Sequence, residues 1–135
     1  MQRKGILLDS SIIIDYFRKA NKEKTRLHQL QQDWPAGYEL IAISSLTVFE
    51  LYCGATDCGK KEDLGTILVP MKVVLCTAKV AKQAGQDYID LKKRNQLIGT
   101  LDILIGATSI VYGYPLLTLN REHFQRIHGI KLFEM

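Results

Sequence analysis

The chain has 135 residues, of which 47% are hydrophobic and 24% are charged, and these proportions are typical of a globular protein. A chain of this length can bury its own core, and we expect residues 1–135 to form a single domain. The formal net charge of +4 is a weak indication of an anionic partner such as nucleic acid. The three cysteines have no Cys-x-x-Cys spacing, so they indicate neither a disulfide framework nor a zinc knuckle, and a cytoplasmic location is expected.

The first predicted element is a strand that is buried on both faces. Residues 6–8 are all apolar without alternation, and the run ends at Asp9. In an α/β protein such a strand leads through a loop into a helix, here predicted over residues 11–19 with Ser10 or Ser11 as its cap. Asp9 is therefore expected at the carboxyl edge of a parallel sheet, where open α/β folds usually place their sites.

Glu50 is a second carboxylate that stands among mostly apolar residues. A polar helix over residues 21–33 and a short strand over residues 39–43 precede its helix, which begins at Ser44 and Ser45 and ends at about Ala55 or Cys58. The neighbours of Glu50 three and four positions away are mostly apolar, so its side chain is expected to face the protein. It is either a buried carboxylate held by an arginine or by backbone amides, or part of a site.

The middle of the chain continues the alternation of strands and helices. A helix is predicted over residues 60–68, a β-branched strand over residues 72–75, and a long amphipathic helix from Thr77 to about residue 95. The residues expected to pack that helix on the core are Ala78, Ala81, Ala84, Tyr88 and Leu91.

Asp102 is the one charge in a strongly apolar helix predicted over residues 101–112, with Thr100 as a plausible cap. A carboxylate in a first turn is favoured by the helix dipole, and that effect alone can explain it. The apolar stretch from Leu97 to Leu119 has about the length of a membrane span, but Asp102 and Pro115 argue against one. A strand over residues 116–119 and a final edge strand over residues 130–133 complete the pattern.

This order of elements predicts a three-layer α/β/α sandwich with a central, mostly parallel sheet of four to five strands. The loops after parallel strands share one rim, and Asp9, Glu50 and Asp102 can meet there. Like charges brought together destabilise one another unless a cation lies between them. Carboxylate oxygens favour a hard divalent ion, Mg²⁺ or Mn²⁺, which can activate water for attack on a phosphodiester.

Four segments in this order resemble the PIN-domain ribonucleases, and specifically the VapC-type toxins of type II toxin–antitoxin systems. Each motif is weak alone, whereas four in order over nearly the whole chain are specific. The segments are Leu8-Asp9-Ser10-Ser11, Phe49-Glu50-Leu51-Tyr52-Cys53-Gly54, Leu101-Asp102-Ile103-Leu104-Ile105-Gly106-Ala107-Thr108-Ser109, and Leu117-Thr118-Leu119-Asn120-Arg121-Glu122-His123-Phe124 with Ile127-His128-Gly129-Ile130 after it.

The resemblance implies a metal-dependent endoribonuclease that leaves a 5′-phosphate and a 3′-hydroxyl. It assigns Asp9, Asp102 and Glu50 as ligands of Mg²⁺ or Mn²⁺ and as catalytic residues together with Asn120. It also implies a cognate antitoxin protein and a homodimer, and residues 97–119 argue against membrane association. The accessory residues are Ser10, Thr118, Arg121 and His123.

One position departs from the family pattern. Many relatives carry an acid just before the phenylalanine of the last motif, where this chain has His123. A neutral imidazole can hold water or a phosphate, whereas the lost charge can weaken metal binding.

Two other classes of protein also place an aspartate at the end of a first strand. A haloacid-dehalogenase-like phosphatase needs a second aspartate two residues after the first, and Ser11 occupies that place; a receiver domain needs a paired acid and a mid-chain aspartate that are not visible. The main alternative is a catalytically inactive PIN fold that serves as a binding or assembly module, against which the retention of all three acids argues.

Overall fold

Four parallel strands form the centre of the structure, a computed structural model that describes residues 3–135. They are β1 (Gly5–Leu8), β2 (Leu40–Ser44), β3 (Lys72–Val74) and β4 (Leu116–Leu117), in the spatial order β3-β2-β1-β4. Because all four run the same way, their carboxyl ends lie at one edge of the sheet, as the sequence predicts.

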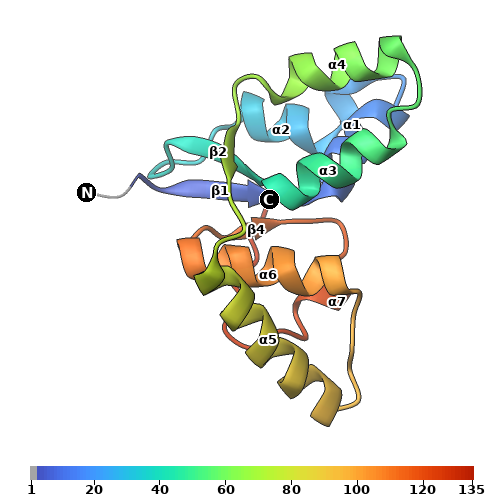
Figure 1. The fold of residues 1–135 in the computed structure, drawn as a ribbon. Helices are drawn as coiled ribbons and strands as arrows, with labels where there is room; N and C mark the ends of the chain where they lie inside the picture. Colours follow the sequence, from blue (N-terminus) through green and yellow to red (C-terminus); the bar gives the residue numbers. More distant parts are fainter. Residues whose placement is uncertain (1–2) are drawn as a thin grey trace.

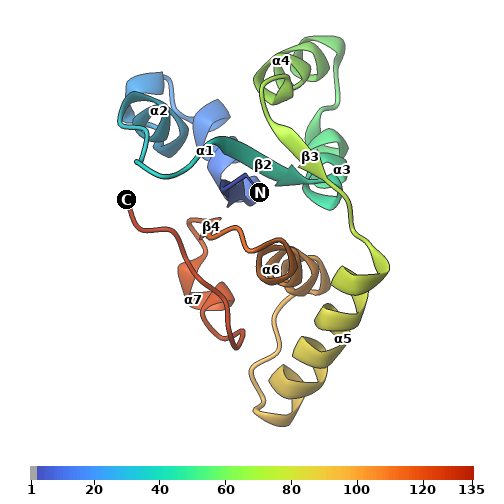
Figure 2. The ribbon, with the colours of Figure 1, turned by 90° about the vertical axis from the view of Figure 1, so that its left-hand side faces the viewer.

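Helices cover both faces of this sheet. In Figure 1 the first four α-helices lie above the strands and the last three lie below them, and Figure 2 separates the same two groups. This arrangement confirms the expected three-layer α/β/α fold. The helices are α1 (Ser10–Arg18), the 3₁₀ helix η1 (Lys22–Lys24), α2 (Arg26–Gln32), α3 (Ser45–Gly54), α4 (Cys58–Leu68), α5 (Ala78–Lys93), α6 (Thr100–Tyr112) and α7 (Arg121–Phe124).

The central strand β1 is buried on both sides, which explains its run of apolar residues. Leu7 packs in the core formed with α5 and α6, whereas Ile6 and Leu8 pack in the core formed with α1 to α4. All three side chains are fully buried. Residue alternation in a strand sends neighbours to opposite faces, so two cores demand apolar residues at every position.

Two predicted elements are interrupted in the structure. The helix expected over residues 21–33 is divided into η1 and α2, because the Thr25 hydroxyl donates to the carbonyl of Lys22 and accepts from the amide of His28, ending one helix and capping the next. The expected final strand over residues 130–133 is reduced to a single bridge between Leu116 and Leu132.

The predicted packing stripe of α5 was partly wrong. Ala84 and Leu91 are buried, but Ala78, Ala81 and Tyr88 lie on the exposed side of the helix. The buried positions of α5 are Val80, Ala84, Asp87 and Leu91. In the part of the chain that the structure describes, no helix is long and apolar enough to cross a membrane.

Candidate active site

Asp9 lies directly after β1 and begins α1. Its backbone is extended (φ −91°, ψ 175°), and its carboxylate accepts the amide of Ser11 at 3.1 Å, so Asp9 itself is the N-cap. The expectation that Ser10 or Ser11 caps this helix was therefore wrong. The cap is the last residue with extended backbone, and the chain already turns into the helix at Ser10.

Two hydroxyl groups fix the Asp9 carboxylate. Ser11 Oγ donates to Oδ1, and Thr118 Oγ1, which comes from the end of β4, donates to Oδ2 at 2.7 Å. Ser11 Oγ also accepts the amide of Leu119 at 2.9 Å, and this bond ties α1 to the segment after β4. Ser11 is not among the predicted accessory residues, which include Ser10 and Thr118, although the spacing of two from Asp9 is the usual reach of an N-cap.

Burial makes the ionised form of the Asp9 carboxylate unfavourable. Its side chain is only 4% exposed, and this desolvation, together with the charge of Asp102, raises the pKa of Asp9 although the Ser11 and Thr118 hydrogen bonds lower it. Because a buried charge is unfavourable unless it is paired, a nearby positive charge would strongly stabilise the ionised form of Asp9.

Asp102 lies in the first turn of α6 and faces the same edge of the sheet. Its pKa is raised by partial burial and by the negative charge of Glu50, and lowered by His123. Glu50 lies on α3 and is half-buried. The structure thus couples Asp9 to Asp102 and Asp102 to Glu50 across three separate elements. Thr100 does not cap α6; Gly99 precedes it and no side chain caps its first turn.

Within residues 3–135, no lysine, arginine or histidine forms an ion pair with these acids. None of the ion pairs between described residues includes Asp9, Glu50 or Asp102. The purely structural reading of Glu50 as a carboxylate held by an arginine is therefore not supported by the contacts.

The other predicted site residues differ in their contacts with the acids. Asn120 is exposed, and its backbone N–H donates to Thr118 Oγ1 at 2.9 Å. His123 is exposed and close enough to influence Asp102. Arg121 turns toward the carboxy-terminal segment, where it pairs with Glu134 at 2.6 Å. The Ser10 hydroxyl takes no part in the hydrogen bonds that hold the Asp9 carboxylate.

The donor set suits a hard divalent cation, because every carboxylate and hydroxyl in it offers oxygen. Among the described residues, no three His, Cys, Asp or Glu side chains are close enough to enclose a metal ion. Mg²⁺ does not require such a cage, since it keeps several waters and is usually held by one or two carboxylates and the substrate phosphate. The residues present fit that mode of binding.

The sequence of this chain is similar to one protein family and to individual relatives within known proteins. Residues 6–130 match the model of the PIN domain family. A protein of Rickettsia felis called ribonuclease VapC1 is 54% identical over 135 residues, covering 95% of this chain and 94% of its own. A protein of Methanocaldococcus jannaschii, also called ribonuclease VapC1, is 31% identical over 96% of this chain and 87% of its own.

Solved structures share the fold. The crystal structure of VapBC2 from Rickettsia felis, bound to a DNA fragment from its promoter, aligns with a TM-score of 0.81 at 23% identity over 97% of this chain and 98% of that one. VapBC-5 from Mycobacterium tuberculosis, a member of the VapBC family of toxin–antitoxin systems, aligns with a TM-score of 0.70 at 15% identity over 97% and 98% of the two chains.

Proposed function

The chain belongs to the PIN domain family, and from that premise we propose that it is a metal-dependent endoribonuclease that hydrolyses RNA phosphodiester bonds. The observation that carries the proposal is the buried Asp9 carboxylate at the carboxyl edge of the sheet, held by Ser11 and Thr118, with Asp102 close enough to raise its pKa. Such a group is unfavourable by itself and becomes favourable when it holds a cation. The ribonuclease names of two relatives at 54% and 31% identity support the substrate class.

Asp9 and Asp102 are the residues we assign to hold Mg²⁺ or Mn²⁺, with Glu50 as the third acid. When bound, such a cation lowers the pKa of water and stabilises the charge that develops on a leaving oxygen. The protein itself contributes orientation: Ser11 and Thr118 fix both oxygens of Asp9, so this ligand is held before any substrate arrives.

Residues after β4 complete the site in this proposal. The backbone N–H of Asn120 donates to Thr118 Oγ1, which anchors the start of α7 to a residue that holds Asp9, and we assign the Asn120 side chain to the site. His123, next to Asp102, is assigned to water or phosphate binding. Arg121 contacts phosphate in this scheme only after it leaves Glu134, so its contribution is secondary to those of the acids.

We also assign the chain to a toxin–antitoxin pair. The support is the sequence likeness to proteins called VapC and the fold shared with VapBC complexes. A cognate antitoxin protein, a homodimer and a cytoplasmic location follow from this assignment. An antitoxin that covers the acidic edge or inserts an arginine among the carboxylates would block the cation and the RNA together.

The experiment that tests the proposed function compares cleavage and ion binding in matched variants. Asp9→Asn is expected to reduce Mn²⁺-dependent cleavage of a structured RNA by at least about 100-fold. Isothermal titration should show loss of Mn²⁺ binding in the same variant. Asp63→Asn, which changes an exposed acid of α4, is the control and should behave like the parent.

Two outcomes would contradict this function. Unchanged cleavage by Asp9→Asn would show that the acids are not the catalytic site. Mn²⁺ binding without any cleavage of RNA would instead favour the inactive PIN-fold module, which binds or assembles but does not hydrolyse.

A further inference from the structure

A groove with a volume of about 910 Å³ lies beside the acidic edge, between α2 and the carboxy-terminal residues 133–135. Thr118 and Leu119 line it. The Thr118 hydroxyl donates to the Asp9 carboxylate, and the backbone N–H of Leu119 donates to the hydroxyl of Ser11, which in turn donates to Asp9. Trp34 lines it on the side of the turn that follows α2. Thr118 and Leu119 therefore form the end of the groove nearest Asp9, whereas Trp34 lies toward its other end, close to Glu39 and Leu40 where β2 begins.

The two aromatic rings in the groove are held in fixed positions by one residue, Tyr38. The carbonyl of Tyr38 accepts the indole N–H of Trp34 at 2.9 Å. The ring of Tyr38 meets that of Phe133 edge-on, with centroids 5.6 Å apart. Trp34 is still 38% exposed, so part of its surface is open to a ligand. Rigid, partly exposed aromatic rings are the surfaces on which single-stranded nucleic acids stack their bases.

The charges in the groove favour a base over a phosphate. Arg26 and Arg121 bring two positive charges, and Asp33 and Glu134 bring two negative ones. Arg121 is already paired with Glu134 at 2.6 Å. A phosphate would meet carboxylates without a free excess of positive charge. An unpaired base is neutral, has aromatic faces, and presents both donors and acceptors to such mixed side chains.

We propose that this groove binds an unpaired base of the RNA strand that occupies the acidic site, with Trp34 as its stacking surface. The inference rests on the proposed ribonuclease function and adds to it a determinant of substrate choice away from the acids. Base stacking on one aromatic residue corresponds to roughly 5- to 100-fold in affinity.

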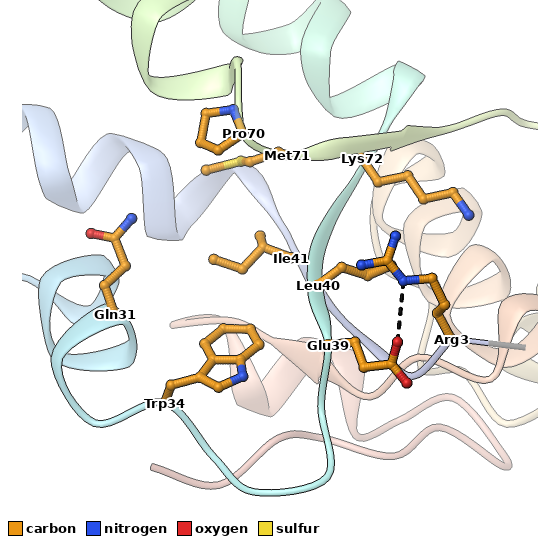
Figure 3. A pocket seen from close by; sticks show the side chains of 9 residues that line it. All are labelled: Arg3, Gln31, Trp34, Glu39, Leu40, Ile41, Pro70, Met71 and Lys72. Carbon is orange, nitrogen blue, oxygen red and sulfur yellow. Dashed lines mark hydrogen bonds and ion pairs between the residues drawn. The ribbon is translucent and has the colours of Figure 1, made fainter.

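A second pocket also contains Trp34 but does not adjoin the acids. It has a volume of about 490 Å³, and Arg3, Glu39 and Met71 line it together with the same indole (Figure 3). The dashed line in Figure 3 marks the ion pair between Arg3 and Glu39, at 3.2 Å. None of the residues that hold Asp9 lines this pocket, so RNA bound at the acidic edge is assigned to the first groove.

Trp34 is the only tryptophan of the chain, so its fluorescence reports on this groove directly. The parent chain is titrated in Ca²⁺, a hard cation that carboxylate oxygens accept, with a 12-residue oligoadenylate and, separately, with an abasic sugar-phosphate chain of the same length. We expect oligoadenylate to quench the fluorescence and the abasic chain to leave it unchanged. Equal quenching by both chains would show phosphate binding and overturn the proposal, as would bound RNA that leaves the fluorescence unaltered.

Variants measured with fluorescently labelled oligoadenylate separate stacking from folding. Trp34→Leu should weaken binding by about 5- to 100-fold, and Trp34→Phe, which keeps a ring, should retain most of the affinity. Tyr88→Leu is the matched control, because Tyr88 is 43% exposed on α5 and does not line the groove. Equal losses in Trp34→Leu and Tyr88→Leu would overturn the proposal.

The two proposals fail in different ways. Absence of cleavage with intact base-dependent quenching would leave the groove assignment standing and reject the nuclease. Cleavage abolished by Asp9→Asn, with no base-dependent quenching in the parent chain, would reject only the groove.

Discussion

Thr118 Oγ1 donates a 2.7 Å hydrogen bond to Oδ2 of Asp9 across a sequence separation of 109 residues. Asp9 ends β1 and Thr118 follows β4, and these two strands are neighbours in the sheet. The carboxylate at the centre of the proposed site is therefore held by the sheet itself, because strand pairing brings the hydroxyl to it. Burial of this pair keeps water from competing for the carboxylate oxygens.

The two adjacent serines after Asp9 are expected to differ in function. Ser11→Ala removes a hydrogen bond to Asp9 Oδ1 and leaves the amide of Leu119 without its acceptor. We expect Mn²⁺ affinity or cleavage to fall by about 10- to 100-fold, as for other groups that orient metal ligands. Isothermal titration and cleavage assays measure this loss. Ser10→Ala is the matched control, and an equal loss in both variants would contradict the assignment of Ser11.

Asp9→Asn is expected to stabilise the metal-free protein at neutral pH. The pKa of Asp9 is raised in the folded state, mainly by burial, so the folded state binds the proton more tightly than the unfolded one. Stability then falls as the pH rises from the ordinary aspartate pKa to the raised one, and the deficit persists above it. Asparagine is neutral and can still bond to Ser11 and Thr118.

Thermal unfolding in EDTA measures this effect. The melting temperature of Asp9→Asn should exceed that of the parent at pH 7, and the difference should vanish at pH values below the ordinary pKa of aspartate. Added Mn²⁺ should stabilise the parent and leave the variant unaffected. A variant less stable than the parent at pH 7 in EDTA would show that the carboxylate is not destabilising.

Asp15 is a buried aspartate whose pKa is lowered, in contrast to the raised pKa of Asp9. Burial acts to raise its pKa, but the ion pair with Lys19 at 2.8 Å and the hydrogen bond from the amide of Arg26 at 3.0 Å outweigh that effect, and the pKa is lowered. Stability from this residue is present above the ordinary aspartate pKa and is lost as the pH falls through the lowered one. Asp15→Asn should therefore cost roughly 1–3 kcal/mol at pH 7.

Chemical denaturation at two pH values tests this prediction. The difference between Asp15→Asn and the parent should shrink at strongly acidic pH, where the parent carboxylate is also neutral. Asp63→Asn, on the exposed side of α4, should change the free energy of unfolding little. A loss of stability in Asp15→Asn that does not depend on pH would point to packing in place of charge.

His123 offers a test of how charge sets the cation affinity. In the structure His123 acts on Asp102 and lowers its pKa. His123→Asp replaces this imidazole by a carboxylate and should tighten Mn²⁺ binding by about tenfold, because an added negative oxygen ligand strengthens a hard-cation site. Titration of Mn²⁺ measures the change. His28→Asp, a histidine substitution on α2, is the control, and unchanged affinity in His123→Asp would place His123 outside the ion's reach.

Local sequence patterns determined most of the fold. The uninterrupted apolar residues of β1 and the carboxylates that interrupt apolar surroundings are visible without coordinates, since burial restricts residue type at each position. For the same reason the strand order along the chain and the three-layer arrangement followed from the alternation of elements. The acids Asp9, Glu50 and Asp102 stood out because a charge is costly where its neighbours are buried.

Other features depended on contacts between distant segments. Only the tertiary structure showed that Ser11 holds Asp9 while Ser10 does not, that Arg121 turns to Glu134, and that Val80 is buried on α5 while Ala81 is exposed. A helix pattern shows which residues can share a face, but the orientation of that face is set by the elements packed against it. The sequence by itself therefore determined which residues are candidates for the chemistry, and the tertiary structure decided which partners hold Asp9, because one of those partners lies 109 residues away.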